Sequence, residues 1–197
     1  MKIAVVKYNA GNIRSVLCAL KRLGYDATVT DDFAELASAD RVIFPGVGEA
    51  STAMAYLKER GLDAFLKTLK QPFLGICLGM QLMCSFSEEH DTSCLGIFDV
   101  PVKKFVPTCG EKIPHMGWNT LQVEEDPLYT GLQDPVWCYF VHSYYVPVCS
   151  ETIAKTEYAH IEFSASLRHD NFWGCQFHPE KSGDLGELIL KNFLEAL

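Results

Sequence analysis

The stretch Phe73-Leu74-Gly75-Ile76-Cys77-Leu78-Gly79-Met80-Gln81 sets one cysteine between two glycines, where an apolar run meets the start of a helix. A buried strand, a tight turn and a helix in this order are typical of a nucleophile elbow, which lifts its central residue above the sheet. At a helix start, unpaired N–H groups and the helix dipole favour the thiolate. A small buried residue in a tight turn is the alternative, because free cysteine is often buried. Cys77 is therefore a candidate nucleophile.

A second motif supplies the groups that a thiol nucleophile needs. The run Phe172-Trp173-Gly174-Cys175-Gln176-Phe177 reads as a strand and is followed by His178-Pro179-Glu180. A histidine can exchange the thiol proton, and a carboxylate on its other nitrogen fixes the tautomer. Pro179 ends strand pairing and holds both side chains in a rigid turn. Metal ligation is weaker because the sequence has no second cluster at ligand spacing and no C-x-x-C pair; a structural turn is the remaining alternative.

Composition limits what these motifs can belong to. The 197 residues, 48% of them hydrophobic, fit a single domain over residues 1–197. The N-terminus lacks the features of a signal peptide, no run reaches membrane-spanning length, and a net charge of −8 argues against nucleic acid. We read seven of the eight cysteines, all except Cys77, as ordinary core or surface residues of a reduced chain. A cytoplasmic protein is expected.

The hydrophobic pattern predicts an α/β domain with a mostly parallel open sheet, flanked by helices and extended by antiparallel strands. In the first half, apolar runs alternate with helical periods, which implies right-handed crossovers. In the second half, short strand-like runs follow one another before a closing helix. The expected strands are 2–7, 27–29, 41–44, 72–76, 100–106, 119–123, 137–146, 152–158, 163–168 and 172–177, and the expected helices are 12–24, 51–69 with a break at Gly61, and one from about residue 184.

The loop Pro45-Gly46-Val47-Gly48 follows another strand of the parallel half, so it should lie near Cys77 at the carboxyl edge of the sheet. Attack on a carbonyl creates an oxyanion, which two converging N–H groups would stabilise: one from Leu78 and one from this loop at Gly46 or Val47. A plain strand-to-helix turn is the alternative. Phosphate binding is excluded because the Walker lysine-serine pair and the full G-x-G-x-x-G pattern are absent.

Taken together, Pro45–Gly48, the Gly75–Gln81 elbow and His178-Pro179-Glu180 resemble the class I, or triad, glutamine amidotransferases, which release ammonia from glutamine. Three further segments resemble the glutaminase subunits that serve histidine biosynthesis: Lys112–Asn119, Tyr139–Tyr144 and Lys181-Ser182. The likeness begins at Gly11 and spans nearly the whole chain. It implies a partner, a (β/α)8-barrel cyclase that consumes the ammonia, and no metal or other cofactor.

The resemblance also implies roles for individual residues. Cys77 would attack the glutamine amide, His178 would move protons and Glu180 would orient His178, through a glutamyl thioester. The substrate glutamine would be held by Gln81, Glu89 and the backbone around Ser143 and Tyr144. The positions that would face the cyclase and gate the ammonia are Tyr139, Trp118 and Lys181.

Other functions remain as alternatives. A cysteine-histidine hydrolase of similar fold would share the elbow without needing Gln81 or the segment around His115, and a non-catalytic module would lack a triad member. Glutaminase subunits of other synthases share the triad but are disfavoured by His115–Asn119 and Lys181-Ser182. The first loop, Lys7-Tyr8-Asn9-Ala10, departs from related sequences, and no catalytic role is assigned to it. The five histidines other than His178 are read as surface, interface or hydrogen-bonded core residues, with His142 nearest the site.

Overall fold

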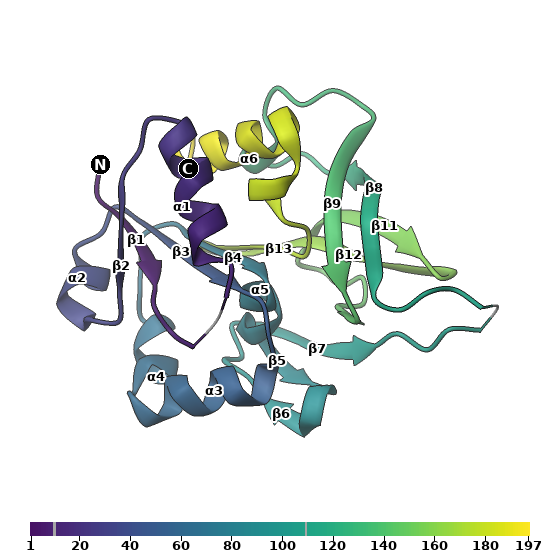
Figure 1. The fold of residues 1–197 in the computed structure, drawn as a ribbon, viewed down its shortest axis with the longest axis horizontal. Helices are drawn as coiled ribbons and strands as arrows, with labels where there is room; N and C mark the ends of the chain where they lie inside the picture. Colours follow the sequence, from purple (N-terminus) through teal and green to yellow (C-terminus); the bar gives the residue numbers. More distant parts are fainter. Residues whose placement is uncertain (10, 109) are drawn as a thin grey trace.

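The computed structural model describes residues 1–9, 11–108 and 110–197. A nine-stranded sheet forms its centre, with the strand order β2-β1-β3-β4-β13-β12-β11-β8-β9 (Figure 1). In chain order these strands are β1 (Ile3–Val6), β2 (Ala27–Thr30), β3 (Arg41–Gly46), β4 (Phe73–Cys77), β8 (His115–Val123), β9 (Val136–His142), β11 (Thr152–Tyr158), β12 (Ile161–His169) and β13 (Phe172–Cys175).

The sheet has a parallel half and an antiparallel half. The pairs β1–β2, β1–β3, β3–β4 and β4–β13 are parallel, whereas β12–β13, β11–β12, β8–β11 and β8–β9 are antiparallel. The predicted α/β sheet with added antiparallel hairpins is thus confirmed. β13 comes late in the chain but pairs directly with β4, so two segments far apart in sequence end side by side.

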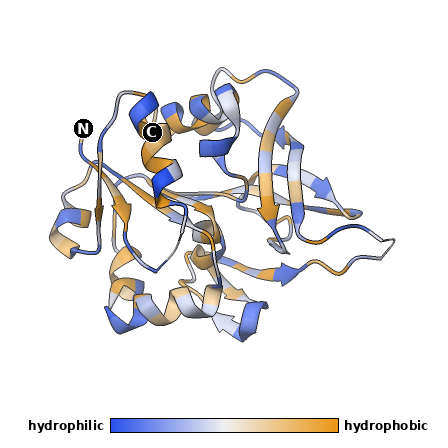
Figure 2. Ribbon diagram, in the orientation of Figure 1, coloured by the Kyte–Doolittle hydropathy of each residue, from blue (hydrophilic) through white to orange (hydrophobic). Residues whose placement is uncertain are grey.

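Helices cover both faces of the sheet, as Figure 1 shows. On one face lie α1 (Ile13–Arg22) and α6 (Gly183–Glu195), and on the other α2 (Phe33–Ala37), α3 (Ala50–Glu59), α4 (Leu62–Leu66) and α5 (Leu78–Met83). Alternate side chains of β1 serve the two cores: Ile3 and Val5 pack with α1 and α6, and Ala4 and Val6 with the opposite layer. Figure 2 shows the hydrophobic residues of β1 in orange.

A second, four-stranded sheet corrects two of the sequence predictions. Its order is β10-β7-β5-β6, formed by β5 (Cys84–Ser87), β6 (Thr92–Ser93), β7 (Phe98–Lys104) and β10 (Tyr144–Tyr145). The single strand predicted over 137–146 is wrong, because the chain leaves β9 at His142 and changes sheets at Ser143, whose carbonyl accepts from Phe105 N–H at 3.1 Å. The strand predicted near 100–106 is β7, which belongs to this second sheet and pairs in parallel with β5 and antiparallel with β10, with no hairpin to the next strand along the chain.

The other predicted elements are found within a few residues of their expected bounds. The helical stretch 51–69 is broken at Gly61, which adopts a left-handed φ of 69° between α3 and α4. The pattern did not reveal α2, β5, β6 or the short 3-10 helices η1 (Glu89–Asp91), η2 (Pro127–Tyr129) and η3 (Pro179–Lys181). No helix among the described residues is long and apolar enough to cross a membrane.

Candidate active site

Cys77 is the last residue of β4 and directly precedes α5, as expected for a nucleophile elbow. Its backbone has φ 54° and ψ −110°, a conformation that costs free energy for any residue with a side chain. The flanking glycines allow this turn to pack: a Cβ on Gly79 would lie 1.8 Å from the carbonyl oxygen of Phe44, and one on Gly75 2.8 Å from the N atom of Met80. The elbow is therefore strained at its centre and closely packed on both sides.

The sheet topology brings the second motif to this elbow. β13 pairs in parallel with β4, with Cys175 opposite Ile76, so both strands end at the same edge. His178 follows β13 and is held in place through its backbone, since its N–H donates to Tyr139 O at 2.9 Å and its carbonyl accepts from Ser182 Oγ at 2.7 Å. The imidazole is thus positioned by strand order, beside Cys77.

His178 and Glu180 form a buried pair. Their side chains are 0% exposed, and His178 Nδ1 lies 2.8 Å from Glu180 Oε1. Asn12, which has a left-handed φ of 69° just before α1, donates its side-chain amide to the same Glu180 oxygen. With Nδ1 held by the carboxylate, Nε2 is the ring nitrogen left to exchange a proton with the thiol.

Electrostatics favour the protonated form of His178. Burial alone lowers its pKa, but the negative charge on Cys77 and the hydrogen-bonded Glu180 carboxylate outweigh burial and raise the pKa to about 10. An imidazolium in this position stabilises a thiolate and carries the proton that a leaving amine needs.

A cavity of about 320 Å³ opens beside Cys77. The Cys77 sulfur lies 3.8 Å from the carbonyl oxygen of Val141, which lines the cavity, and 3.7 Å from the side-chain amide nitrogen of Gln176, which is buried outside the lining. The cavity is lined by Val47, Gly48, Cys77, Leu78, Gln81, Glu89, Pro114, Val141, His142, Ser143 and Tyr144. Of the residues predicted to handle glutamine, the structure therefore brings the nucleophile and all four substrate-binding candidates to one hollow.

The seven described cysteines are all free thiols, and Cys77 differs from the other six. Burial raises the pKa of the thiols of Cys84, Cys94, Cys138 and Cys175, which keeps them protonated and unreactive. None of the other six lines the cavity. Cys109, which we also read as an ordinary cysteine, lies outside the described residues.

The predicted oxyanion loop borders the elbow. β3 runs beside β4 with Gly46 opposite Cys77, and Val47 and Gly48 line the cavity. Gly48 has a φ of 128°, open to glycine but not to larger residues. Tyr8 Oη donates to Pro45 O at 2.7 Å, and the N–H of Gly11 donates to the carbonyl of Val47 at 3.4 Å. Tyr8 and Gly11 thus each contact the oxyanion loop, whereas Ala10 of the first loop lies outside the described residues.

The predicted glutamine-binding residues lie on three elements. Gln81, on α5, donates its side-chain amide to Tyr144 O at 3.1 Å and to Gln176 Oε1 at 2.9 Å. Glu89, in η1, accepts from the N–H of Ala50 at 2.7 Å and so caps the start of α3. Ser143 and Tyr144 contribute the segment that leads from β9 to β10.

The three predicted interface residues lie on one surface. Trp118 on β8 is opposite Tyr139 on β9, with ring centroids 6.1 Å apart. Lys181 in η3 places its Nζ 6.0 Å from the Tyr139 ring centroid. Trp118 is 53% exposed, so it is not the core residue of the alternative interpretation. All three therefore group around the outer face of β8 and β9, next to the triad.

Three residues at the site were missed from sequence. Asn12 was noted only as a helix start, yet it holds Glu180 across 168 positions of sequence. Gln176 lies between Gln81 and the Cys77 sulfur, and Tyr8 supports the oxyanion loop. Their polar side chains next to the motifs were the available signal, but nothing in their spacing indicates these contacts.

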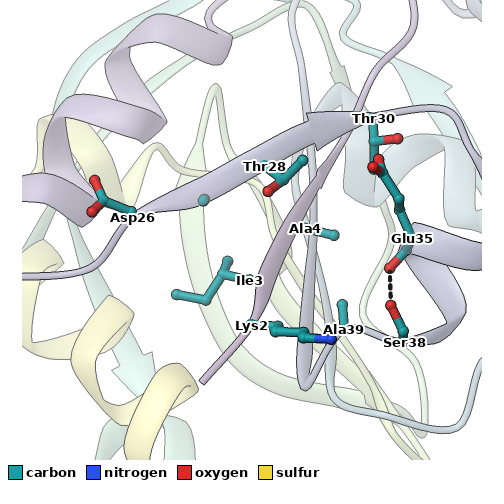
Figure 3. Close-up of a pocket in the computed structure, with 10 residues that line it drawn as sticks. Lys2, Ile3, Ala4, Asp26, Thr28, Thr30, Glu35, Ser38 and Ala39 are labelled. Atoms are coloured by element: carbon teal, nitrogen blue, oxygen red, sulfur yellow. Dashed lines mark hydrogen bonds between the residues drawn. The ribbon is translucent and has the colours of Figure 1, made fainter.

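A hollow of about 250 Å³ adjoins the Cys77 cavity and shares Val47, Gly48 and Leu78 with it, and a separate hollow of about 360 Å³ lies at the edge formed by β1, β2 and α2 (Figure 3). This separate hollow shares no lining residue with the Cys77 cavity, and cysteine and histidine are absent from its lining, so it has no thiol or imidazole for the same chemistry. Across residues 1–9, 11–108 and 110–197, no three His, Cys, Asp or Glu side chains are grouped so as to hold a metal ion.

A thiol at an elbow, a buried histidine and a carboxylate at the edge of an α/β sheet are the groups that a cysteine-dependent enzyme with a Cys–His–Glu triad would need. The family model for glutamine amidotransferase class-I matches residues 4–197. The chain belongs to this family and, within it, to the group of imidazole glycerol phosphate synthase subunit HisH.

The relatives cover the whole chain. The sequence is 62% identical to the imidazole glycerol phosphate synthase subunit HisH of Bacteroides fragilis over 196 residues, which covers 99% of this chain and 100% of the relative. The sequence is 47% identical to the same subunit of Idiomarina loihiensis, and the match covers 99% of this chain and 98% of the relative. A crystal structure of a glutamine amidotransferase shares the fold at 20% sequence identity, with a TM-score of 0.75. The match covers 98% of this chain and 97% of that structure's chain.

Proposed function

We propose that this chain hydrolyses glutamine to glutamate and ammonia through a thioester on Cys77, and passes the ammonia to a (β/α)8-barrel cyclase subunit. The cyclase would use it to make imidazole glycerol phosphate and an aminoimidazole carboxamide ribotide in histidine biosynthesis. One observation carries this proposal: the strained Cys77 lines a cavity large enough for an amino acid and lies next to the His178–Glu180 pair. The close relationship to HisH subunits supports the choice of substrate and pathway.

In the first half-reaction, the Cys77 thiolate attacks the side-chain carbonyl carbon of glutamine. The oxygen becomes negatively charged and accepts hydrogen bonds from the N–H of Leu78 and from the Gly46–Val47 loop. The His178 imidazolium gives its proton to the departing nitrogen, the C–N bond breaks, and ammonia and a glutamyl thioester remain.

In the second half-reaction, the neutral His178 takes a proton from water as the water oxygen attacks the thioester. Collapse of this intermediate breaks the C–S bond, which releases glutamate and restores the thiolate and the imidazolium. Glu180 stays ionised throughout and stabilises the imidazolium in each resting state. One glutamine and one water thus give one glutamate, one ammonia and one proton, which the new side-chain carboxyl group releases to the solvent.

A partner is part of the proposal because free ammonia is protonated in water and loses its nucleophilicity. The outer face of β8 and β9 suits a docking surface: Met116, Trp118 and Trp137 are 63%, 53% and 46% exposed. Large apolar side chains exposed together on one face mark interaction sites. Because Tyr139 and Lys181 adjoin this face and His178 binds Tyr139 O, ammonia would leave the triad on this side. We place the complex in the cytoplasm, where its free thiols stay reduced.

An electrophilic glutamine analogue tests the nucleophile and the substrate together. A chloroketone analogue of glutamine should add one covalent group per chain, found by peptide mass spectrometry on Cys77, and excess glutamine should slow the labelling. The matched control is Cys84→Ala, which removes a buried thiol far less prone to react and should label like wild type. Labelling at another cysteine, or no protection by glutamine, would refute the proposal.

A further inference from the structure

Two buried histidines next to the cavity have no part in the reaction described above. His115, the first residue of β8, and His142, the last of β9, are register partners in the antiparallel pair and are 2% and 6% exposed. Their rings are in direct contact, with His115 Nδ1 3.0 Å from His142 Nε2. A buried imidazole pair with no nearby metal site needs another explanation.

The protons of the pair can be assigned from the groups at its two ends. His142 Nδ1 lies 2.7 Å from the carbonyl oxygen of Tyr144, which can only accept, so Nδ1 carries the proton. In a neutral ring, Nε2 of His142 must then accept, and His115 Nδ1 must donate to it. His115 Nε2 in turn accepts from the side-chain amide of Asn119 at 3.5 Å. In each of these three hydrogen bonds, the donor is therefore the group nearer Asn119 and the acceptor is the group nearer Tyr144.

The surroundings keep both rings neutral. His115 is stacked on Tyr158 and on Phe140 with ring centroids 4.0 Å and 4.9 Å away, and Phe163 lies against both histidines. Burial lowers the pKa of His115 to about 4 and that of His142 to about 3, and in His142 the proximity of His115 and His178 adds to the effect. At neutral pH each imidazole is thus one donor and one acceptor, with both positions used.

The chain of hydrogen bonds ends on the wall of the substrate cavity. The Tyr144 carbonyl that accepts from His142 also accepts from Gln81 Nε2 at 3.1 Å. Gln81, His142, Ser143 and Tyr144 all line the cavity beside Cys77. Ser143 lies between β9 and β10, where the chain leaves one sheet for the other, and Tyr144 is the first residue of the two-residue strand β10.

We propose that Asn119, His115 and His142 form a neutral hydrogen-bonded relay that fixes the Ser143–Tyr144 backbone against Gln81 and thereby sets the affinity for the amino-acid substrate. These are positioning residues, because none of them acts on the reacting amide. The proposal rests on the proposed function for the identity of the substrate, glutamine. The arrangement of protons in the relay does not depend on it.

A pair of amide substitutions at one position tests the direction of the relay. The side-chain nitrogen of asparagine can take the place of imidazole Nδ1, and that of glutamine the place of Nε2. His115→Asn therefore keeps a donor for His142, whereas His115→Gln loses it and leaves His142 Nε2 buried without a partner. For the chain paired with the barrel subunit, His115→Gln should raise the KM for glutamine about tenfold and change kcat less than threefold. His115→Asn should stay within about threefold of wild type in both.

Equal KM values for the two variants, or a loss confined to kcat, would overturn the proposal. Nitrogen-15 NMR of the wild-type chain gives a second test that needs no variant activity. At pH 7 the imidazoles of His115 and His142 should both be neutral with the proton on Nδ1. A proton on Nε2, or a charged ring, at either residue would refute the relay. Lack of glutaminase activity in the wild-type complex would instead refute the proposed function and leave the NMR result to decide the relay.

Discussion

At the scale of single residues, the site combines strain with burial. Cys77 has a positive φ that only a supporting structure can maintain, and His178 and Glu180 have no exposed side-chain surface. A buried ion pair contributes little to stability on balance, because desolvation offsets the attraction. The proposed mechanism gives this pair a role, because proton transfer there needs an imidazolium beside the thiol.

Replacing Glu180 should separate orientation from nucleophilic attack. Glu180→Gln keeps the shape of the side chain but removes the charge that supports the imidazolium, so kcat for glutamate release should fall about 10²- to 10⁴-fold. Asn12→Ala removes only a donor to that carboxylate, and its kcat should fall much less, about three- to tenfold. Steady-state kinetics of the complex measures both. A Glu180→Gln enzyme within twofold of wild type would contradict the assigned role.

The sequence predicted that Cys77, His178 and Glu180 act together because each lies in a short motif with chemical meaning, and the structure brings the three side chains together. Sequence reasoning did not identify Asn12, Tyr8 or Gln176, because each contacts a residue far away in the sequence. Asn12 binds Glu180 across 168 positions, Tyr8 binds Pro45 across 37, and Gln176 contacts Cys77 across 99. Such contacts follow from how strands and loops are placed, which no local pattern encodes. The buried histidine pair was interpreted only as surface, interface or core for the same reason.

At the scale of elements, the elbow depends on the close approach of α5 to β3. A Cβ atom on Gly79 would lie only 1.8 Å from the carbonyl oxygen of Phe44 in β3. Because this contact is with backbone, no side chain can move aside to relieve it. The short helix α5 can therefore start directly after Cys77 only with glycine at this position. Both glycines of the motif serve packing as well as the turn.

Adding one methyl group at Gly79 should break this packing. Gly79→Ala is expected to lower the free energy of unfolding by about 3 kcal/mol or to prevent folding. The control is Gly11→Ala, whose added Cβ meets the Val47 side chain at 2.9 Å, and which should cost under about 1 kcal/mol. Urea unfolding followed by circular dichroism measures both. Equal stability of the two variants would argue against the packing account.

The elements of the parallel half were predictable because strands and helices alternate there with clear periods. The second sheet was not, because β5, β6 and β10 have only four, two and two residues and show no periodicity. The predicted strand over 137–146 failed for a related reason: its apolar run continues through the point where the chain changes sheets. Hydrophobic pattern does not distinguish one long strand from two strands in different sheets.

At the scale of the whole molecule, the two buried histidines should make stability depend on pH. Both have lowered pKa values in the folded chain, about 4 for His115 and about 3 for His142, and recover about 6.5 on unfolding. Between about pH 6.5 and pH 4 the unfolded chain therefore binds more protons. The free energy of unfolding should fall on acidification by up to about 1.4 kcal/mol per pH unit for each histidine, and show no such effect above about pH 7.

Urea unfolding at a series of pH values measures this slope. His142→Asn removes one of the two titrating groups but keeps a donor for the Tyr144 carbonyl. Its free energy of unfolding should therefore fall less steeply between about pH 6.5 and pH 4 than that of wild type. Identical slopes for the two proteins would show that His142 does not titrate on unfolding.

The partner surface can be tested with one tryptophan. Trp118→Ala should weaken binding of the barrel subunit by about 2 kcal/mol, or about 30-fold in Kd, because exposed tryptophans at an interface centre often dominate affinity. Phe33→Ala is the control: it is 41% exposed on α2, at the opposite edge of the sheet order from β9. Isothermal titration calorimetry should show wild-type affinity for this variant. Equal weakening by both would place the interface elsewhere.

Release of glutamate from glutamine shows whether Cys77 produces ammonia for a cyclase partner. It should be measured with the purified chain alone, with the barrel cyclase, and with the cyclase and its ribotide substrate, using Cys77→Ala as the control. We predict slow release by the chain alone, a strong rise in the full mixture and none above background with Cys77→Ala. Release that the cyclase does not stimulate, or that persists in Cys77→Ala, would contradict this account.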